Sequence, residues 1–441
     1  MLRLIHHLYS FLYTLGLLLY FPFYLIRVLF GQKESIPILI RGGFLPKKLI
    51  EITSKKGCRV WIHAVSVGEV NSIRTLVESL ALPSDCLYIS TTTQTGQTVA
   101  QEHFGGKATV FFFPLDWAFS CLRYLRSIDP DLIILTETEL WPTVIRCVKK
   151  REIPLLLING RFSDQSFKRY RQFGFLTRSM LTSFCKLGMQ SRQDRERAIN
   201  LGSISDRTHT VGNLKFDYSL PDNFQATQAS QDLGMLLGKE NGSLIWVCGS
   251  THEGEEETLL NVFLELRKEF DQLRWVLAPR HPHRAKSVTK LLNKTPLTVV
   301  RRSQMDSVSS ASPHIAVIDT IGELAHLYEI ADVVFIGGTL IPVGGHNLIE
   351  AAHFKKPIIF GPHMENFREM KEVFLRSYGA LQIHSSLELE TKMKDLLRDT
   401  STREWLGRNA RTVVRENKGA IRRTLKLIRV CAPEIVNSQN E

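Results

Sequence analysis

The chain has 441 residues, of which 44% are hydrophobic and 23% are charged, a composition that excludes an intrinsically disordered protein. Because a single core rarely grows beyond about 250–300 residues, this length predicts two domains. The 56 Lys and Arg residues outnumber the 44 Asp and Glu residues, and the net charge of +12 favours an anionic partner such as a phosphorylated substrate, a membrane surface or a nucleic acid. The seven cysteines are scattered without any Cys-x-x-Cys pair, which argues against a disulfide framework or a zinc site and indicates a reducing compartment.

The N-terminus carries a long uncharged segment. Residues 8–26, LYSFLYTLGLLLYFPFYLI, include no charged side chain and are numerous enough for a helix to cross a bilayer. A cleaved signal peptide is disfavoured, because the run is long and no small-x-small cleavage site follows it. Positive residues such as Arg27 and Arg41 come after the run. We therefore predict that residues 1–32 are a single-pass anchor in the inner membrane with a cytoplasmic catalytic body; a helix lying in the membrane interface is the alternative.

Beyond Gly42, short aliphatic runs alternate with segments of helix length. The predicted strands are 60–65, 87–91, 109–114, 132–136, 154–159, 209–212, 244–250, 274–279, 314–319, 333–338 and 357–361. Nearly continuous aliphatic strands of this kind indicate parallel sheets buried on both faces, and the repeated pattern predicts two doubly wound α/β domains. The predicted boundaries are 42–215 and 243–420 for the domains, 216–242 for a polar linker and 421–441 for a C-terminal segment. Since ligands bind at the carboxyl ends of parallel strands, we expect two Rossmann-like sheets that face each other across a cleft.

A glycine-rich stretch at 337–350, GGTLIPVGGHNLIE, follows a predicted strand and leads into a predicted helix. Glycines allow backbone N–H groups to converge on an anion, although the pattern is neither a Walker loop nor G-x-G-x-x-G. Asn347 and Glu350 would share a helical face, and the carboxylate could accept hydrogen bonds from a ribose diol. Ordinary glycine turns and a helix cap are the alternative.

Basic residues follow other strands of the second half. Arg280 in APRHPHR (278–284) could bind a phosphate or a base, since a guanidinium offers a planar fork of donors. Lys215 in GNLKFD and Ser250 in GSTHEGEEE are candidate phosphate contacts. Lys215 could instead be a linker lysine, and Ser250-x-x-Glu253 could be only a capping box. No metal site is expected, because His281 and His283 in APRHPHR lack a third ligand.

Carboxylates gather in the first half. Glu69 in WIHAVSVGEV (61–70) lies just behind a glycine where a buried strand ends, so it is either a helix-start charge or a catalytic base. Glu137 and Glu139 in TETELWP (136–142) could raise the pKa of Glu69 or position a hydroxyl. The Asp129-Pro130-Asp131 triplet has the DxD form of metal-dependent glycosyltransferases, but Asp-Pro before a strand is typical of a turn.

Seven motifs in this order resemble the Kdo transferase family, which transfers 3-deoxy-D-manno-octulosonic acid (Kdo) in lipopolysaccharide synthesis. The motifs are HAVSVGE, ETELWP, NGR, GNLKFD, GSTHEGEE, PRHPHR and GGHNLIEAA. The resemblance implies a GT-B glycosyltransferase with an N-terminal membrane helix. Such an enzyme would invert the configuration at the anomeric carbon and would need no metal or cofactor. It further implies CMP-Kdo as the donor and a lipid A precursor (lipid IVA) as the acceptor, with one or more Kdo residues added.

The resemblance also implies roles for individual residues. Glu69 would be the catalytic base and Glu137 the second essential carboxylate, with Glu139 as the alternative. The implied CMP-binding residues are Pro279, Arg280, Ile321, Gly322, Glu323, Asn347, Leu348, Ile349 and Glu350. Lys215 would be a further phosphate contact. Another membrane-associated GT-B enzyme with a different nucleotide sugar is the nearer rival; a membrane-tethered nucleic-acid-binding protein is remote, because no recognition helix or basic cluster with interleaved aromatics is present.

Overall fold

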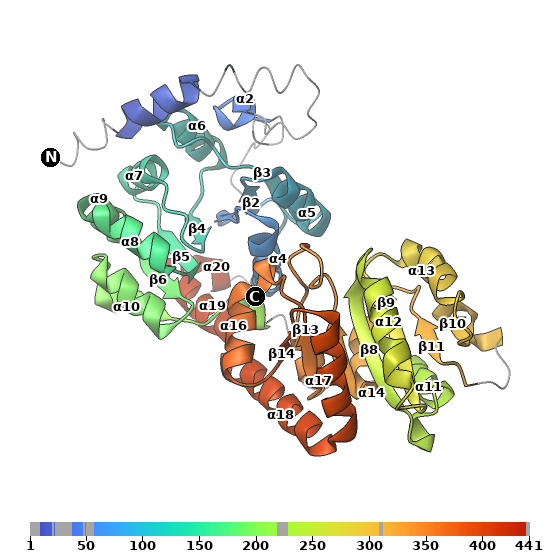
Figure 1. Ribbon diagram of the computed structural model, residues 1–441. Coiled ribbons are helices and arrows are strands. Elements are labelled where there is room, and N and C mark those ends of the chain that lie inside the picture. The colour runs from blue at the N-terminus through green and yellow to red at the C-terminus, as the bar shows by residue number, and fades with distance from the viewer. Residues whose placement is uncertain are drawn as a thin grey trace. The chain divides into compact units, whose positions relative to one another are not determined.

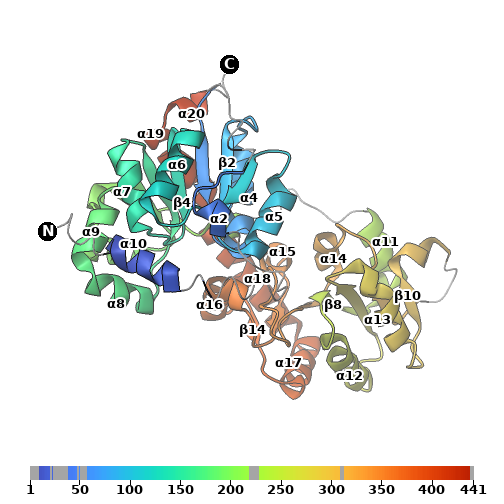
Figure 2. The same cartoon turned by 90° about the horizontal axis from the view of Figure 1, so that it is seen from above.

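The computed structural model describes residues 9–19, 22, 38–46, 49, 57–217, 228–307 and 312–437. The chain forms two compact units: unit 1 comprises Met1–Tyr218 and Lys418–Glu441, and unit 2 comprises Ser219–Asn417. Each unit is built on its own sheet with helices on both faces (Figures 1 and 2). The predicted class, α/β with two parallel sheets, is confirmed.

The sheet of unit 1 has seven parallel strands in the order β3-β2-β1-β4-β5-β6-β7. Their bounds are β1 Val60–His63, β2 Leu87–Thr91, β3 Thr109–Phe112, β4 Leu132–Thr136, β5 Leu155–Gly160, β6 Lys186–Met189 and β7 Thr208–Thr210. The chain runs outward from β1 to β3 and then returns to the other side of β1 as β4, where Val60 pairs with both Leu87 and Leu132. The carboxyl ends of β1 and β4 therefore flank the switch point, which is where open α/β sheets bind ligands.

Helices cover both faces of this sheet (Figure 1). Their bounds are α2 Ile38–Arg41, α4 Val67–Leu80, α5 Gln94–Phe104, α6 Ala118–Ile128, α7 Pro142–Lys150, α8 Asp164–Gln172, α9 Gly174–Leu181, α10 Arg192–Asn200, α19 Ala420–Cys431 and α20 Glu434–Asn437. Alternate strand residues supply the two cores: Trp61 packs with α6 and α7, whereas Val60 and Ile62 pack with α4, α5 and α19. Because both faces are buried, the strands need apolar residues at most positions, which explains the nearly continuous aliphatic runs.

The sheet of unit 2 is also seven-stranded and parallel, in the order β10-β11-β9-β8-β12-β13-β14. Its strands are β8 Leu244–Thr251, β9 Leu273–Pro279, β10 Val299–Arg301, β11 Ile315–Val317, β12 Val333–Ile336, β13 Ile358–Phe360 and β14 Leu381–Gln382. Its helices are α11 Gln228–Leu236, α12 Glu255–Arg267, α13 Ala285–Leu292, α14 Leu324–Ile330, α15 Ile349–His353, α16 Arg368–Arg376, α17 Ser386–Arg398 and α18 Thr400–Asn417. The switch point lies between β8 and β12, so the segments that follow these two strands are adjacent.

Two predicted boundaries differ from the observed organisation. The stretch 216–242, predicted as a linker, contains α11, which buries Leu233 against unit 2. The segment 421–441, predicted as separate, contains most of α19, which packs in the core of unit 1. The Asp217 carboxylate accepts hydrogen bonds from the backbone N–H groups of Gly419 (2.6 Å) and Ile421 (2.5 Å) and so fixes the start of this helix.

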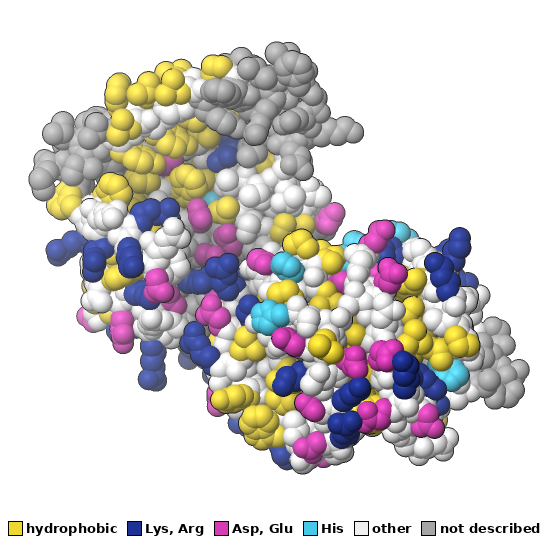
Figure 3. All heavy atoms as spheres, viewed as in Figure 1, with side chains coloured by type: hydrophobic (Ala, Val, Ile, Leu, Met, Phe, Trp, Pro, Cys, Tyr) yellow, Lys and Arg dark blue, Asp and Glu magenta, His cyan; other side chains and the backbone are white. Residues whose placement is uncertain are grey.

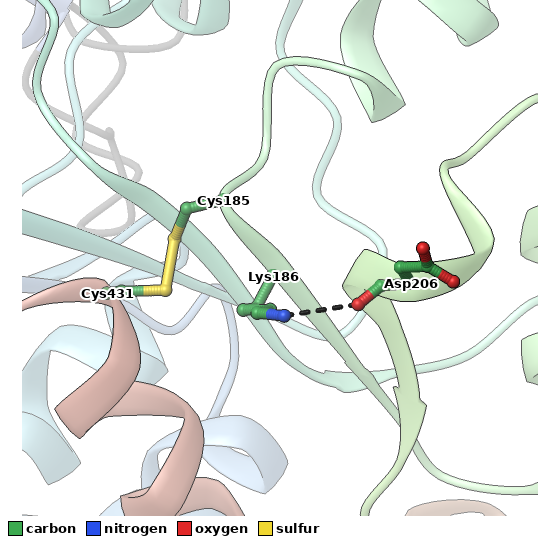
Figure 4. The surroundings of a disulfide bond; sticks show 4 residues. All are labelled: Cys185, Lys186, Asp206 and Cys431. Atoms are coloured by element: carbon green, nitrogen blue, oxygen red, sulfur yellow. Dashed lines mark hydrogen bonds between the residues drawn. A yellow bond between two sulfur atoms is a disulfide. The ribbon is translucent and has the colours of Figure 1, made fainter.

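One disulfide bond contradicts the expectation drawn from the scattered cysteines. Cys185, just before β6, is bonded to Cys431 at the end of α19, with their Cα atoms 6.2 Å apart (Figure 4). The next residue, Lys186, donates a hydrogen bond to the backbone oxygen of Asp206 (3.1 Å), which ties β6 to the loop before β7. A separation of 246 residues hides this pair from the sequence, because only the return of α19 to unit 1 brings the two cysteines together.

The N-terminal helix of residues 9–19 is hydrogen-bonded to the rest of unit 1 through one buried residue, Asp116. The Tyr9 hydroxyl donates to Asp116 (2.8 Å), and the Tyr13 hydroxyl accepts from the Asp116 backbone N–H (3.3 Å). Asp116 also accepts from the N–H groups of Thr143 (3.1 Å) and Val144 (2.8 Å), in the first turn of α7. None of the helices among the described residues has both the length and the apolar character needed to cross a membrane. The rest of the 8–26 run, apart from residue 22, lies outside the described residues, so the anchor stays a prediction.

Candidate active site

The carboxylate of Glu69 is held at the switch point of unit 1. The chain leaves β1 and enters α4 at Val67, which places Glu69 in the first turn of the helix with only 6% of its surface exposed. Its Oε2 accepts hydrogen bonds from the backbone N–H of Val65 (3.0 Å) and the hydroxyl of Thr136 (2.5 Å). Its Oε1 accepts a longer one from the hydroxyl of Ser66 (3.3 Å). Thr136 is the last residue of β4, so the two strands that flank the switch point together fix one carboxylate.

Two further carboxylates lie at the end of β4. The pKa of Glu69 is raised by burial and, to a smaller degree, by the charge of Glu139, whereas the bonds from Thr136 and Val65 lower it. The pKa of Glu137 is raised by burial and by Glu69, and that of Glu139 by burial and by Glu137. A carboxylate whose pKa is raised toward neutral pH is a better general base than an ordinary one. The structure therefore brings together the three acids that the sequence singled out.

Cationic side chains approach this acidic cluster. Lys215 lies on a 3₁₀ turn, Leu214–Asp217, and together with Arg161 it lowers the pKa of Glu137. A Cβ at Gly68 would lie 4.0 Å from Nζ of Lys215, so the ammonium group comes close to the start of α4. Glu137 itself has φ +53°, a left-handed conformation that costs free energy in a residue other than glycine. Such conformations concentrate at functional sites, which agrees with this placement.

In unit 2 a different carboxylate organises the switch point. Glu255 is fully buried, and it accepts hydrogen bonds from the backbone N–H groups of His252 (2.9 Å), Gly338 (2.6 Å), Thr339 (2.9 Å) and Leu340 (2.9 Å). This carboxylate fastens the glycine-rich segment after β12 to the segment after β8. The prediction that the N–H groups of this segment converge on an anion is therefore wrong for residues 338–340, because their donors are already used by the protein.

The alternative interpretation of Ser250 as a helix cap is also wrong. Helix α12 begins at Glu255 with Gly254 as its N-cap residue, in the left-handed conformation with φ +95°. Ser250 instead belongs to β8 and has φ +58°. Its carbonyl oxygen would lie 2.4 Å from a Cβ at position 337, so only glycine fits there. The backbone crossing of β8 and β12 thus explains the first glycine of the GG pair.

The predicted CMP-binding residues lie beyond the carboxyl ends of β9, β11 and β12. Pro279 ends β9, and the backbone N–H of Arg280 donates to Thr251 (2.9 Å) while its side chain is exposed. Ile321 is 87% exposed beside Gly322, and Glu323 accepts a hydrogen bond from Arg302 (3.0 Å).

The segment 347–350 meets the short helix α15. The side chain of Asn347 accepts from the backbone N–H of Ile349 (3.0 Å) and interacts with Glu350, whose pKa is raised by burial and lowered by Asn347 and Arg280. Leu348 and Ile349 bury their side chains completely. These two residues can therefore offer only backbone groups to a ligand. Arg280, Asn347 and Glu350 are brought together, as expected for one binding site.

Comparison with known proteins identifies the family. A family model described as 3-deoxy-D-manno-octulosonic-acid transferase (kdotransferase) matches residues 40–218. The 3-deoxy-D-manno-octulosonic acid transferase of Haemophilus influenzae is 33% identical over 373 residues, which cover 84% of this chain and 86% of the relative. The enzyme of that name from Rickettsia bellii is 31% identical over 400 residues, which cover 90% and 92% of the two chains. The chain belongs to the Kdo transferase family.

This membership confirms the resemblance seen in the seven motifs and the prediction of a glycosyltransferase. Among solved structures, HepE from Anabaena in complex with UDP matches with a TM-score of 0.52 and 12% identity over 85% of this chain and all of that chain, which shows the fold alone. The C-terminal CMP-Kdo binding domain of WaaA from Acinetobacter baumannii is 26% identical over 42% of this chain and 97% of that domain, with a TM-score of 0.39.

We predict that Glu139→Gln moves the acidic limb of the pH–rate profile to lower pH. A general base works when deprotonated, so with Glu69 in that role activity would fall as the pH drops through its pKa. Removing the Glu139 charge lowers that pKa. The measurement is kcat/KM for Kdo transfer between pH 4.5 and 8. Glu78→Gln, an exposed substitution on the same helix, should leave the limb unchanged; a limb that stays in place in Glu139→Gln would contradict the electrostatic coupling.

Proposed function

We propose that this protein transfers Kdo from CMP-Kdo to a lipid A precursor at the inner membrane, with inversion at the anomeric carbon and without a metal ion. The observation that carries the proposal is the buried Glu69 carboxylate, fixed by Thr136 and Val65 in a chain of the Kdo transferase family. An acceptor hydroxyl is a poor nucleophile at neutral pH, so a positioned base is required.

In the proposed mechanism Glu69 takes the proton of the acceptor hydroxyl while the hydroxyl oxygen forms a bond with the anomeric carbon of Kdo. The bond from that carbon to the phosphate oxygen breaks on the opposite face, and the electron pair leaves with CMP. Burial and the charge of Glu139 keep the pKa of Glu69 raised, and the charge of Glu69 in turn raises the pKa of Glu137. Lys215 offsets part of the negative charge of the cluster and stabilises the developing anion.

Unit 2 would bind the donor nucleotide. Arg280 offers an exposed guanidinium beside Glu350, and that carboxylate is placed to accept hydrogen bonds from a ribose. The buried side chains of Leu348 and Ile349 hold the intervening backbone in place. The exposed Ile321 supplies an apolar surface that suits one face of a base. These contacts need no cofactor.

The acceptor lipid would be reached from an apolar surface of unit 1. The helix of residues 9–19 turns Tyr9 and Tyr13 toward Asp116 and leaves its opposite side apolar, and Figure 3 shows hydrophobic side chains gathered there. Neighbouring α2 is bonded to α6 through the Tyr124 hydroxyl, which donates to the Ile40 carbonyl (2.9 Å). The exposed apolar side chains of these segments are Phe11, Leu12, Leu15, Leu18, Leu19, Leu39, Phe44, Trp117 and Phe119. A protein surface in contact with water rarely exposes so many apolar side chains together. We therefore propose that these side chains contact the bilayer, and we call them the membrane-facing surface.

We predict that Glu69→Gln abolishes most of the transfer activity while the fold persists. Loss of a general base costs at least about 10²-fold in rate. Because the folded-state pKa of Glu69 is raised, its charged form destabilises the fold at neutral pH, so the melting temperature of the variant should equal or exceed that of the wild type. Turnover close to that of the wild type would reject the assigned role.

We predict that CMP raises the melting temperature of the protein and that UDP at the same concentration does not. A ligand that binds only the folded state stabilises it by RT ln(1 + [L]/Kd). Thermal unfolding with each nucleotide measures the effect, and cytidine reports the share contributed by the nucleoside. Equal stabilisation by CMP and UDP would favour a GT-B enzyme with a different nucleotide sugar.

We predict that Phe11→Ser, Leu15→Ser and Leu18→Ser together weaken binding to vesicles that contain anionic lipids by at least about 10-fold. Each buried apolar side chain contributes about 1.5–3 kcal/mol, and none of the three takes part in the bonds to Asp116. Co-sedimentation measures the binding, with Leu387→Ser, at an exposed leucine of unit 2, as the control. Unchanged binding of the triple variant would show that the basic surface carries the attachment instead.

A further inference from the structure

Two histidines from separate loops form a close pair at the switch point of unit 2. Nε2 of His252 lies 2.9 Å from Nε2 of His346, and the two rings are nearly parallel, with an interplanar angle of 7°. His252 follows β8, and its backbone N–H donates to Glu255. His346 follows the last two glycines of the glycine-rich segment. The pair therefore joins the same two segments that Glu255 fastens.

The absence of a side chain at Gly338 makes room for the pair. A Cβ at this position would lie 3.0 Å from Nε2 of His346 and 3.3 Å from Cδ2 of His252. The second glycine of the GG motif is therefore explained by close packing against two imidazole rings. This explanation replaces the anion-binding role that the sequence suggested, since the N–H group of Gly338 donates to Glu255.

The surroundings of the pair are rich in positive charge. Arg280 and His281 face both histidines, and Arg284 also acts on His252. The acidic side chain that faces His252 is Glu256, and its carboxylate is bonded to Arg284 at 2.7 Å. The nearby Glu255 carboxylate is engaged by four backbone N–H groups. This arrangement suits a negatively charged ligand beside Arg280.

Protonation of the pair is unfavourable without such a ligand. Burial and the neighbouring cations lower the pKa of His346 to about 4, and burial lowers that of His252 as well. In the neutral pair one Nε2–H points at the other Nε2, so a single proton lies between the two rings. A second Nε2–H needs another acceptor, and a bound anion both accepts that hydrogen bond and raises the pKa of the pair.

We propose that His252 and His346 act as one acid that hydrogen-bonds the phosphate of the donor and protonates the nucleotide as it leaves. The inference rests on the proposed function, because it takes a cytidine phosphodiester as the donor. As the bond between the anomeric carbon and the phosphate oxygen breaks, the electron pair goes to that oxygen, and the imidazolium gives it a proton. The products are the glycoside, CMP as a monoanion and a neutral histidine pair, which regains its proton from solvent.

The chemistry of the leaving group supports this role. A donor phosphodiester carries one negative charge, whereas a departing phosphate monoester would carry two unless it is protonated. The second pKa of a phosphate monoester is about 6, close to the ordinary pKa of histidine, and proton transfer is most effective between groups of matched pKa. The pair thus neutralises the charge that develops on the departing phosphate. The N–H groups of residues 338–340 cannot do so, because they are bonded to Glu255.

The test uses cytidine 5′-methyl phosphate, a phosphodiester that does not itself titrate near neutral pH. Calorimetric titration in buffers of different ionisation enthalpy measures the protons taken up on binding between pH 6 and 8. We expect uptake by the wild-type protein that grows as the pH falls, since the bound anion raises the pKa of the pair, and no uptake with cytidine. Affinity for the methyl phosphate should decrease as the pH rises, whereas affinity for cytidine should not.

His346→Gln and His252→Gln provide the decisive variants. Each should lose the proton uptake and bind the methyl phosphate at least about 10-fold more weakly, as expected for loss of one hydrogen bond to a charged group, with unchanged affinity for cytidine. His283→Gln, an exposed histidine of the neighbouring loop, should behave as the wild type. Unchanged cytidine affinity also shows that the variants keep their fold.

The outcomes separate this inference from the proposed function. Binding of the methyl phosphate without proton uptake, or uptake that persists in both variants, would overturn the inference and leave the CMP donor intact. Failure of cytidine and its methyl phosphate to bind, together with binding of UDP, would overturn the donor assignment and the inference with it.

Discussion

Parallel pairing of strands that are buried on both faces is the constraint on which the rest of the structure depends. In such a sheet every carboxyl end meets the same edge, and the chain must cross outside the sheet to begin the next strand. Residues as distant as Ser66 and Thr136 therefore contact one carboxylate in unit 1. In unit 2 the same constraint brings His252 and His346 together, from loops that are 94 residues apart. The strand order of each sheet thus determines which side chains meet at each candidate site.

Two buried glutamates show how different environments give one side chain different roles. Glu255 is surrounded by four backbone N–H groups, each within 2.9 Å, which leave it no capacity for a substrate. Glu69 has fewer donors and lies beside Glu137 and Glu139, so its charged form is less well stabilised. Burial raises the pKa of both carboxylates, but the four donors of Glu255 hold a loop in place, whereas at Glu69 the charge of Glu139 raises the pKa further. The number of hydrogen-bond donors and the charge of the neighbouring side chains thus distinguish the structural Glu255 from Glu69, the proposed base.

The sequence predicted the elements whose signal is strong and local. Long aliphatic runs such as 132–136 became strands, and the three acids were predicted to lie together because each follows a strand. Strands β6 (KLGM), β10 (VVR) and β14 (LQ) were missed, because each is short and carries few aliphatic residues. The alternative that placed the cap of α12 at Ser250 was wrong, since the left-handed N-cap residue Gly254 cannot be distinguished in sequence from an ordinary loop glycine.

Contacts between distant segments could not be predicted from the sequence, because they depend on the three-dimensional arrangement of the strands. The Cys185–Cys431 bond, the role of Glu255 and the histidine pair all depend on which loops the two sheets place side by side. Glu255 stands in a run of three glutamates, and nothing in GSTHEGEEE separates the buried Glu255 and Glu256 from the third. A helix-dipole explanation suffices for all three until their burial is known.

The return of α19 to unit 1 makes the second unit an insertion within the first. Asp217 binds the N–H groups of Gly419 and Ile421, so the points where the chain leaves and re-enters unit 1 are held by one carboxylate. During synthesis the ribosome must therefore finish unit 2 before it delivers the helix that completes the core of unit 1. Until then, the apolar face that α19 covers is available to chaperones. A segment that is synthesised after unit 2 thus completes the unit that carries the acidic cluster.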